Sequence, residues 1–329
     1  MRLFLFHACG QFFPLGWAGI NTFLVITAYF LTKKYLQKPQ TDVHVRDSLK
    51  KRAIRLYPSY LTVIIVMTAL FFVSKRQLPG DFFSYFLFAQ NFQKEFVPET
   101  TQVPGTGHFW YLTLDFYLVM IWLIVLRFIP RRYLKLTFIL LLIFSVGYRS
   151  VCTIITNSIT MSYILPWGMM DAFAAGGLLA LISLEEGKPK LPWLTFIMGM
   201  IFFSVCIFAT SERFDVNAIS ALIHYRTASG YADSPLTVQI HLALTLLSFF
   251  VVWLCVSERK HFNILSNRKL VKLGGASYEL FVFHFPILWL LNIVTNDKLV
   301  IVGIGLFLTI VVTMIWKRFL ESKVVVAFT

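Results

Sequence analysis

Nine long apolar runs, separated by short loops rich in lysine and arginine, constrain this chain more than any other feature of its sequence. Each run holds about 17–21 residues, and a helix needs about 20 residues to cross a bilayer. Backbone polar groups in lipid must be paired internally, which favours helices. The sequence therefore predicts an all-α, polytopic integral membrane helical bundle. The runs cover residues 17–33, 54–74, 109–128, 133–149, 163–183, 191–210, 239–257, 276–295 and 298–317.

Composition agrees with a membrane location and argues against nucleic acid as a partner. Hydrophobic residues make up 57% of the chain, and the mean hydropathy is +0.72, more than a soluble core requires. The formal net charge is +14, and the cations lie in short loops between the apolar runs. This placement indicates how the helices are oriented in the membrane and argues against a nucleic-acid-binding surface. The four cysteines show no CxxC spacing, so we interpret them as small apolar residues and expect no metal site.

The basic loops predict which ends of the helices face the cytoplasm. Loops 33–55, 127–135, 184–190 and 258–272 and the C-terminal tail carry the lysines and arginines. All of them fall on one side if the nine runs alternate with one further span before them. The positive-inside rule makes that side cytoplasmic, with both termini inside and loop 211–238 outside. We expect a single membrane-embedded domain over residues 1–329, in the cell inner membrane.

Two short segments need a separate interpretation. The chain runs for only about 13 residues into the turn expected at Phe12–Gly16, too few to span a bilayer, so we expect a truncated first span and about ten spans altogether. Phe82–Phe92 is apolar and aromatic but also too short. Counting it as a span would place basic loops on both sides, so we predict an interfacial or re-entrant segment on the outer side.

The start of the run at 54–74 carries a dense basic cluster of Lys50, Lys51, Arg52 and Arg55. On a helix, Arg52 and Arg55 are three residues apart and share a face. A pair of planar guanidinium groups is well suited to phosphate. The lysines are interpreted as a topological anchor, and for the arginines both an anchor and a phosphate site remain open.

Ionisable residues inside apolar runs are costly and are candidates for function. Four such residues stand out: His7, Asp115, Asp171 and His284. A histidine oriented by a carboxylate is the usual arrangement of a general base, although each group can also bridge helices structurally. The small residues at 172–177 favour a close helix-packing face over a site.

The order of motifs resembles the acyltransferase-3 family of integral-membrane O-acyltransferases, which modify bacterial surface polysaccharides. The resembling stretches are LFHA around His7, NTFLVITAYFL at 21–31, RAIRLYP at 52–58, GHFWYLTLDFYL at 107–118, PWGMMDAFAAGGLLA at 166–180 and LGGASYELFVFHFP at 273–286. The chain departs from the family pattern in carrying a single Asp115 where many members have two glutamates, and no arginine precedes Asp171.

The resemblance implies transfer of an acyl group, usually acetyl from cytoplasmic acetyl-CoA, to a hydroxyl of a surface polysaccharide or its lipid-linked precursor. Acyl-CoA is then a donor substrate, and no bound cofactor is expected. Arg52 and Arg55 would bind the donor phosphates. His7, oriented by Asp115, would act as the base or a transient acyl carrier.

Four further residues, Trp110, Asp171, Tyr278 and His284, are candidates for the pathway between the two sides or for the acceptor site. The same buried polar groups leave two other functions open. One is a transporter or flippase for a lipid-linked sugar, which needs no site for acyl-CoA. The other is a non-catalytic membrane component of a polysaccharide-synthesis complex. The pair Arg52 and Arg55 at a helix start favours the enzyme.

Overall fold

The computed structural model describes residues 18–37, 42–97, 100–156, 159–185, 192–215, 234–257 and 266–321. Over these ranges the ordered elements are helices, and no strand occurs in them. The chain divides into two compact units. Unit 1 includes residues 41–113 and 263–329, and unit 2 includes residues 17–40 and 114–262. The prediction of one membrane domain stays a prediction.

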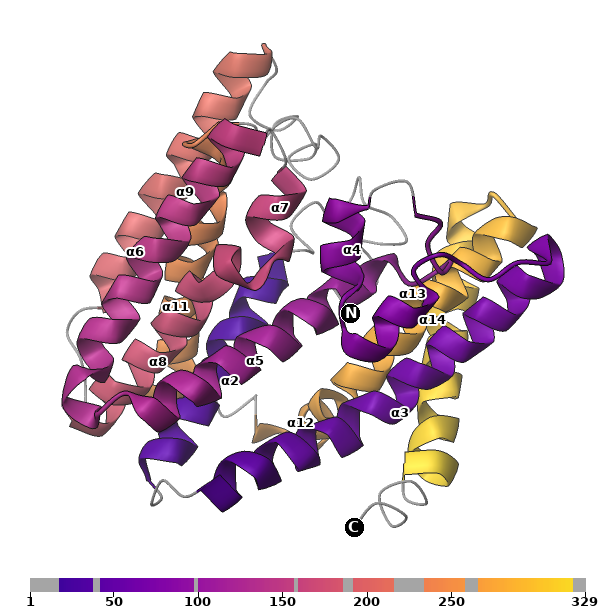
Figure 1. The fold of residues 1–329 in the computed structure, drawn as a ribbon, viewed down its shortest axis with the longest axis horizontal. Helices are drawn as coiled ribbons and strands as arrows, with labels where there is room; N and C mark the ends of the chain where they lie inside the picture. Colours follow the sequence, from indigo (N-terminus) through magenta and orange to yellow (C-terminus); the bar gives the residue numbers. More distant parts are fainter. Residues whose placement is uncertain are drawn as a thin grey trace. The chain divides into compact units, whose positions relative to one another are not determined.

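Unit 2 is a bundle of long helices joined by short turns. Its long helices are α2 (Gly19–Leu36), the part of α5 (Trp110–Phe128) from residue 114, α6 (Arg131–Thr156), α8 (Met170–Glu185), α9 (Pro192–Phe214) and α11 (Ile240–Ser257). Its short elements are α7 (Ile159–Ile164), η4 (Pro166–Met169) and η5 (Thr237–Gln239). Helix α8 packs against α2, α6 and α11, and α9 packs against α11 (Figure 1).

Two glycines let α8 lie at the centre of this unit. A Cβ atom on Gly176 would lie 2.3 Å from the carbonyl oxygen of Val25, and one on Gly177 would lie 2.4 Å from the ring of Trp122. Neither distance is compatible with a side chain, so the backbone of α2 approaches α8 as closely as small residues permit, and the Trp122 ring of α5 packs against Gly177. The close packing face predicted at 172–177 is confirmed.

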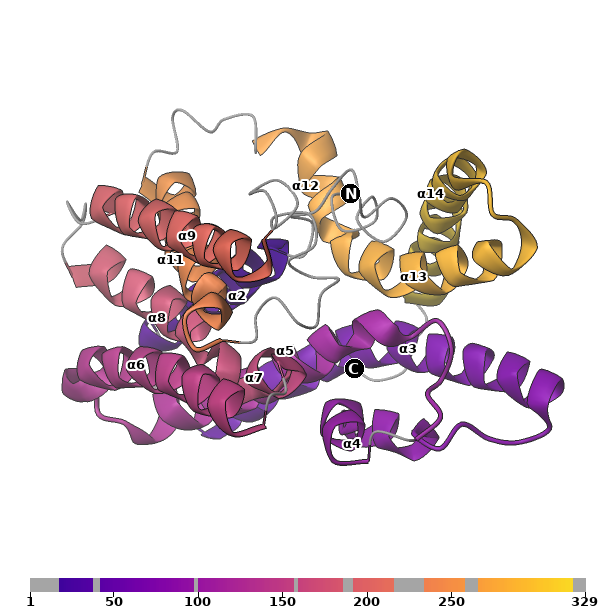
Figure 2. The ribbon, with the colours of Figure 1, turned by 90° about the horizontal axis from the view of Figure 1, so that it is seen from above.

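Unit 1 contains the longest helix and the last helices of the chain. Its elements are α3 (Asp42–Lys75), η2 (Phe82–Leu87), α4 (Gln90–Phe96), η3 (Gly107–Phe109), α12 (Arg268–Gly275), α13 (Ser277–Val294), α14 (Lys298–Ile315) and the π-helical η7 (Trp316–Glu321). Helix α13 packs against α14 (Figure 2). It also contacts α3 and η3, and η2 contacts both α3 and α4.

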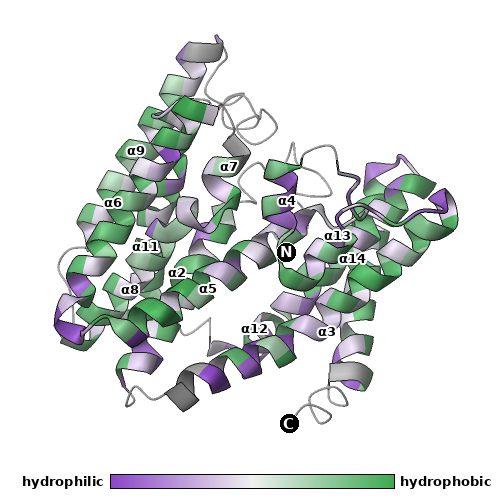
Figure 3. Cartoon of the chain, in the orientation of Figure 1, coloured by the Kyte–Doolittle hydropathy of each residue, from purple (hydrophilic) through white to green (hydrophobic). Residues whose placement is uncertain are grey.

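Eight of the described helices are long and apolar enough to cross a membrane. Burial distinguishes central helices from peripheral ones. In the helix at 166–184, 72% of the residues in its apolar stretch are buried, whereas in the helix at 192–212 only 17% are. Most residues along α6 and α9 are apolar (Figure 3), and many of their large apolar side chains are exposed, as a lipid-facing helix requires. The all-α polytopic prediction is confirmed. The first predicted run, 17–33, coincides with α2, which is not one of these eight helices, and the expected truncated first span lies outside the described residues.

Some boundaries differ from the sequence prediction. Helix α3 begins at Asp42, so the basic cluster belongs to the helix and not to a loop. The run predicted to end at Arg149 continues as α6 to Thr156, which places Arg149 inside the helix. A short helix, α12, forms within the basic loop at 258–272.

The aromatic segment at 82–92 does not form a spanning helix. It breaks into η2 and the start of α4, and it folds back along α3. The hydroxyls of Tyr57 and Tyr60 donate to the carbonyls of Phe86 and Tyr85 at 2.6 Å and 3.0 Å. Because Tyr60 lies 15 residues before Lys75, the segment returns by about 22 Å along the helix axis.

Candidate functional site

The two arginines of the basic cluster lie near the start of α3 in unit 1. Arg55 is exposed and Arg52 is partly buried. Their spacing of three residues on a continuous helix places them on one face, as predicted. A solvent-accessible guanidinium beside a partly buried one can bind the oxygens of a phosphate from two directions. What they bind is not tested by the geometry and stays a prediction.

Tyr278 connects α13 to this part of α3. Its hydroxyl donates a 2.7 Å hydrogen bond to the backbone carbonyl of Leu56, the residue that follows Arg55. The bond therefore fixes the start of α13 beside the arginine face. A second polar contact supports the same end of α13, because Lys317 lies 3.4 Å from Glu279 and 3.0 Å from the carbonyl of Gly275.

Two buried histidines meet further along α13. The ring centroids of His284 and His108 are 5.0 Å apart, and the rings are nearly perpendicular. Phe281 packs against both of them. The Nδ1 atom of His284 lies 2.6 Å from the carbonyl of Phe281. Because a carbonyl can only accept, Nδ1 donates this hydrogen bond, and in the neutral form of the ring the lone pair lies on Nε2.

The backbone at Gly105 explains how η3 comes so close to α13. Gly105 has a φ of +67°, a conformation that favours glycine. A Cβ atom there would lie 2.8 Å from Met67 and 3.3 Å from the Cα atom of Pro286. The segment before His108 is thus pressed between α3 and α13, which sets the position of the His108 ring.

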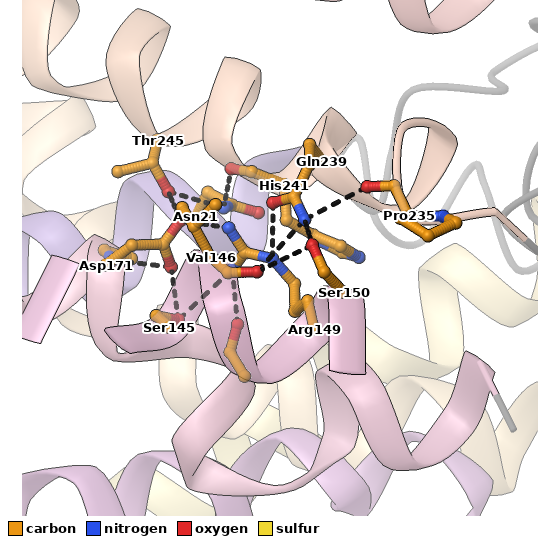
Figure 4. Close-up of polar contacts among 12 residues, drawn as sticks. Asn21, Ser145, Val146, Arg149, Ser150, Asp171, Pro235, Gln239, His241 and Thr245 are labelled. Carbon is orange, nitrogen blue, oxygen red and sulfur yellow. Dashed lines mark hydrogen bonds and ion pairs between the residues drawn. The ribbon is translucent and has the colours of Figure 1, made fainter. Parts of the chain in front are cut away.

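Unit 2 contains a different polar site, built around a buried ion pair. A guanidinium nitrogen of Arg149 on α6 lies 2.9 Å from a carboxylate oxygen of Asp171 on α8, and neither side chain is exposed (Figure 4). Arg149 also donates to Gln239, to Ser145 and to the carbonyl of Gly168. Four of its five N–H donors therefore have acceptors, as a buried charge requires.

The carboxylate of Asp171 is equally well satisfied. One oxygen accepts from the backbone N–H of Ala172 at 3.0 Å and from Ser145 at 3.4 Å. The other accepts from Thr245 at 3.3 Å, and Thr245 in turn accepts from Asn21 at 3.1 Å. The cluster joins α2, α6, α8 and α11 around Asp171. The assignment of Asp171 to the pathway or the acceptor site stays a prediction.

The remaining predicted residues are placed as follows. Trp110 is partly buried at the first turn of α5, and its carbonyl accepts from Asn91 at 2.8 Å. Asp115 is buried on the same helix, in unit 2. His7 lies outside the described residues, so its pairing with Asp115 stays a prediction. Within the described ranges, no three His, Cys, Asp or Glu side chains gather in a way that could hold a metal ion.

Sequence reasoning missed two residues of these sites. His108 stands in the stretch GHFWYLTLDFYL but precedes the apolar run, so it was not counted among the intramembrane groups. Arg149 is the last residue of the run predicted at 133–149. Its signal was the apolar stretch that continues after it to Ile155, which is typical of an arginine inside a span. Although no arginine precedes Asp171 in its own helix, Arg149 reaches it from α6.

Comparison with known proteins decides the family. A model of the acyltransferase domain matches residues 4–317, nearly the whole chain. The chain belongs to the acyltransferase-3 family. All four sequence stretches that hold Arg52, His108, Asp171 and His284 fall inside the matched range.

Curated relatives of this acyltransferase-3 chain are larger proteins. Two of them are the O-acetyltransferase OatA of Staphylococcus aureus strain NCTC 8325 / PS 47 and that of strain COL. Each is 23% identical over 343 residues, covering 98% of this chain and 55% of the relative. The chain thus spans about half the length of the curated relatives that it matches. No solved structure matches it significantly.

Proposed function

We propose that this chain is a membrane O-acyltransferase of the bacterial inner membrane. It moves an acyl group, acetyl in the first instance, from cytoplasmic acyl-CoA to a hydroxyl of a surface polysaccharide or its lipid-linked precursor. Family membership over residues 4–317 and the printed activity of the relatives support this assignment. Both termini and the basic loops are assigned to the cytoplasm by the positive-inside rule.

The hydrogen bond from Tyr278 to Leu56 is the observation that carries the proposal. It holds α13, with His284, against the helix that presents Arg52 and Arg55. Donor binding at the arginines and passage of the acyl group along the path that includes His284 need groups on α3 and α13 to keep a fixed spacing, and a packed helix pair provides that more accurately than a loop.

The proposed reaction uses a base and an anion site. The acceptor hydroxyl gives its proton to a neutral imidazole, and its oxygen attacks the thioester carbonyl carbon. The tetrahedral intermediate collapses, the C–S bond breaks, and the thiolate of CoA leaves and takes up a proton. We assign the base to His7, oriented by Asp115, and the donor phosphates to Arg52 and Arg55. Trp110, Tyr278 and His284 belong to the path.

The test uses the protein in proteoliposomes supplied with acetyl-CoA carrying a labelled acetyl group and with bacterial envelope glycan. Wild type should transfer label to glycan hydroxyls, and His7→Gln should lose about 10²–10⁴-fold of the rate while acetyl-CoA binding is kept. His261→Gln, in the predicted basic loop at 258–272, is the matched control. Absence of transfer by wild type overturns the function. An active His7→Gln beside an inactive His284→Gln moves the base to α13.

A further inference from the structure

Helix α12 (Arg268–Gly275) is amphipathic, and the proposed reaction does not use it. At about 3.6 residues per turn, its basic residues fall within about 100° of one another around the helix axis: Arg268, Lys269 and Lys272. Its large apolar residues fall on the opposite side: Leu270, Val271 and Leu273. Two sides of opposite character on one short helix are typical of a helix that lies along a boundary between water and an apolar phase.

The apolar side of α12 is largely uncovered by the rest of the described chain. Leu270, Val271 and Leu273 are 42%, 58% and 53% exposed, and no residue of α12 is buried. The basic side chains of α12 form no ion pair with any residue that the structure describes. Because neighbouring apolar side chains gain free energy when they leave water, this side favours a partner outside the described chain.

The place of α12 in the chain brings it to the membrane surface. Only Ala276 separates it from α13, one of the eight helices long and apolar enough to cross a membrane. The backbone N–H of Ala276 donates to the carbonyl of Leu273, three residues back, and its φ and ψ of −102° and 0° are not those of a regular helix. Helix α12 therefore ends there and lies where a spanning helix enters the headgroup region.

Hydrogen bonds hold the end of α12 beside the spanning helices. The hydroxyl of Ser277 donates to the carbonyl of Gly274 at 2.7 Å. The ammonium of Lys317 in η7 donates to the carbonyl of Gly275 at 3.0 Å. These bonds connect α12 to the first turn of α13 and to the segment that follows α14. The helix is thus kept at the level where α13 begins and α14 ends.

The dimensions of α12 favour a lipid surface over a protein partner. Its length is about 12 Å, and it has 8 residues, whereas a specific protein interface uses about 20–30 residues a side. A leaflet needs no matching shape, because its acyl boundary accepts apolar side chains of any arrangement. Anionic headgroups also attract lysine and arginine, strengthening binding about fivefold for each cation near the surface. Charge complementarity therefore favours anionic lipid.

We infer that α12 docks in the headgroup region of the leaflet where α13 begins, with its apolar side toward the acyl chains and its cations on anionic phospholipid headgroups. The inference does not depend on the acyl-transfer reaction. It uses the membrane-spanning character of α13 and the two sides of α12. Because exposed charges are screened by salt, the docking should weaken at high ionic strength.

The test measures the depth of α12 in lipid nanodiscs. Leu270→Cys, in a chain whose four native cysteines are replaced by alanine, carries a nitroxide on the apolar side. Its accessibility to oxygen, which concentrates in lipid, is compared with its accessibility to a water-soluble nickel complex. We expect the oxygen-to-nickel ratio to be severalfold higher in discs of equal parts phosphatidylcholine and phosphatidylglycerol than in discs of phosphatidylcholine alone. A nitroxide at Lys272→Cys, on the basic side, should stay accessible to nickel in both.

Removal of charge tests the role of the cations separately. Replacing the basic residues of α12 by glutamine should abolish the rise in the ratio at position 270. The matched control replaces Arg131, Arg132 and Lys135, exposed cations at the start of α6, by glutamine and should leave the rise unchanged. Hydrogen exchange of residues 268–275 in the unmodified chain makes the same comparison without a label. Protection should be higher in the anionic discs and should fall at high salt.

Three results would overturn the inference. A nitroxide at position 270 that is accessible to nickel in both kinds of disc places α12 in water. One that is shielded from both oxygen and nickel places a second copy of the chain or another protein over the apolar side. Equal depth and equal exchange protection in the two kinds of disc remove the role of anionic headgroups.

Discussion

Arg149 and Asp171 form an ion pair of 2.9 Å with both side chains fully buried between α6 and α8. Their other hydrogen bonds reach Ser145, Gln239 and Thr245. A buried charge that loses its partner is more costly than a pair removed together, because the remaining charge stays desolvated. The pair therefore holds unit 2 in one arrangement of its helices.

Removing one member of this pair should be strongly destabilising. We expect Arg149→Met and Asp171→Leu each to lower the free energy of unfolding by about 3–5 kcal/mol, and the double variant to lose less than either. The measurement is denaturant unfolding in lipid nanodiscs. Arg132→Met, exposed on the same helix, is the control and should change little. Losses that simply add in the double variant would contradict a direct pair.

The arginines of α3 should govern the affinity for the donor. Arg52→Ala and Arg55→Ala should each weaken acetyl-CoA binding, because a charge-assisted phosphate contact contributes about 1.5–3 kcal/mol. Arginine-to-lysine variants should recover only part of it, since an ammonium cannot bind two oxygens in parallel. Titration with acetyl-CoA gives the affinity. Lys51→Ala is the neighbouring control. If the double alanine variant binds acetyl-CoA with unchanged affinity, the arginines serve only as topological anchors.

The bond from Tyr278 to Leu56 should matter for stability and for the reaction together. Tyr278→Phe removes one hydroxyl, so we expect a loss of about 0.5–1.5 kcal/mol in unfolding free energy and a lower kcat with donor affinity kept. Thermal unfolding and acyl-transfer kinetics measure the two effects. Tyr133→Phe, exposed on α6, should change neither. A normal kcat in Tyr278→Phe would show that docking of α13 is not needed for catalysis.

Asp81 should make the segment at residues 81–103 sensitive to pH. Burial raises the pKa of this carboxyl to about 6, although the hydrogen bonds from Val103 and Tyr85 act in the opposite direction. The folded state then binds more protons than the unfolded state between about pH 4 and pH 6. The folded state is therefore more stable below pH 4 than above pH 6. The loss of stability as the pH rises through 6 is about 1–2 kcal/mol after allowing for solvent screening.

Hydrogen exchange of residues 81–103 between pH 4 and pH 8, corrected for the intrinsic exchange rate, tests this. Asp81→Asn cannot ionise, yet its amide oxygen still accepts from Val103, so protection should become independent of pH in that variant. Asp297→Asn, at the exposed start of α14, is the control. A wild-type segment whose protection increases with pH would contradict the raised pKa.

The sequence by itself determined the helical, multi-pass character and most of the helix positions. Lipid requires about 20 apolar residues and a fully paired backbone, so hydropathy alone locates spans such as α9 and α14. It also indicated the packing face at Gly176 and Gly177, because only small residues allow helices to approach closely. The motif order was specific enough to suggest the family.

Only the tertiary structure decided which polar residues meet. The pairing of Arg149 with Asp171, and that of His108 with His284, join residues 22 and 176 positions apart, and their contacts depend on how helices pack. Hydropathy reports the cost of placing a charge in lipid but not the partner that offsets it. The return of residues 82–92 along α3 was likewise set by the hydrogen bonds of Tyr57 and Tyr60, which no local pattern encodes.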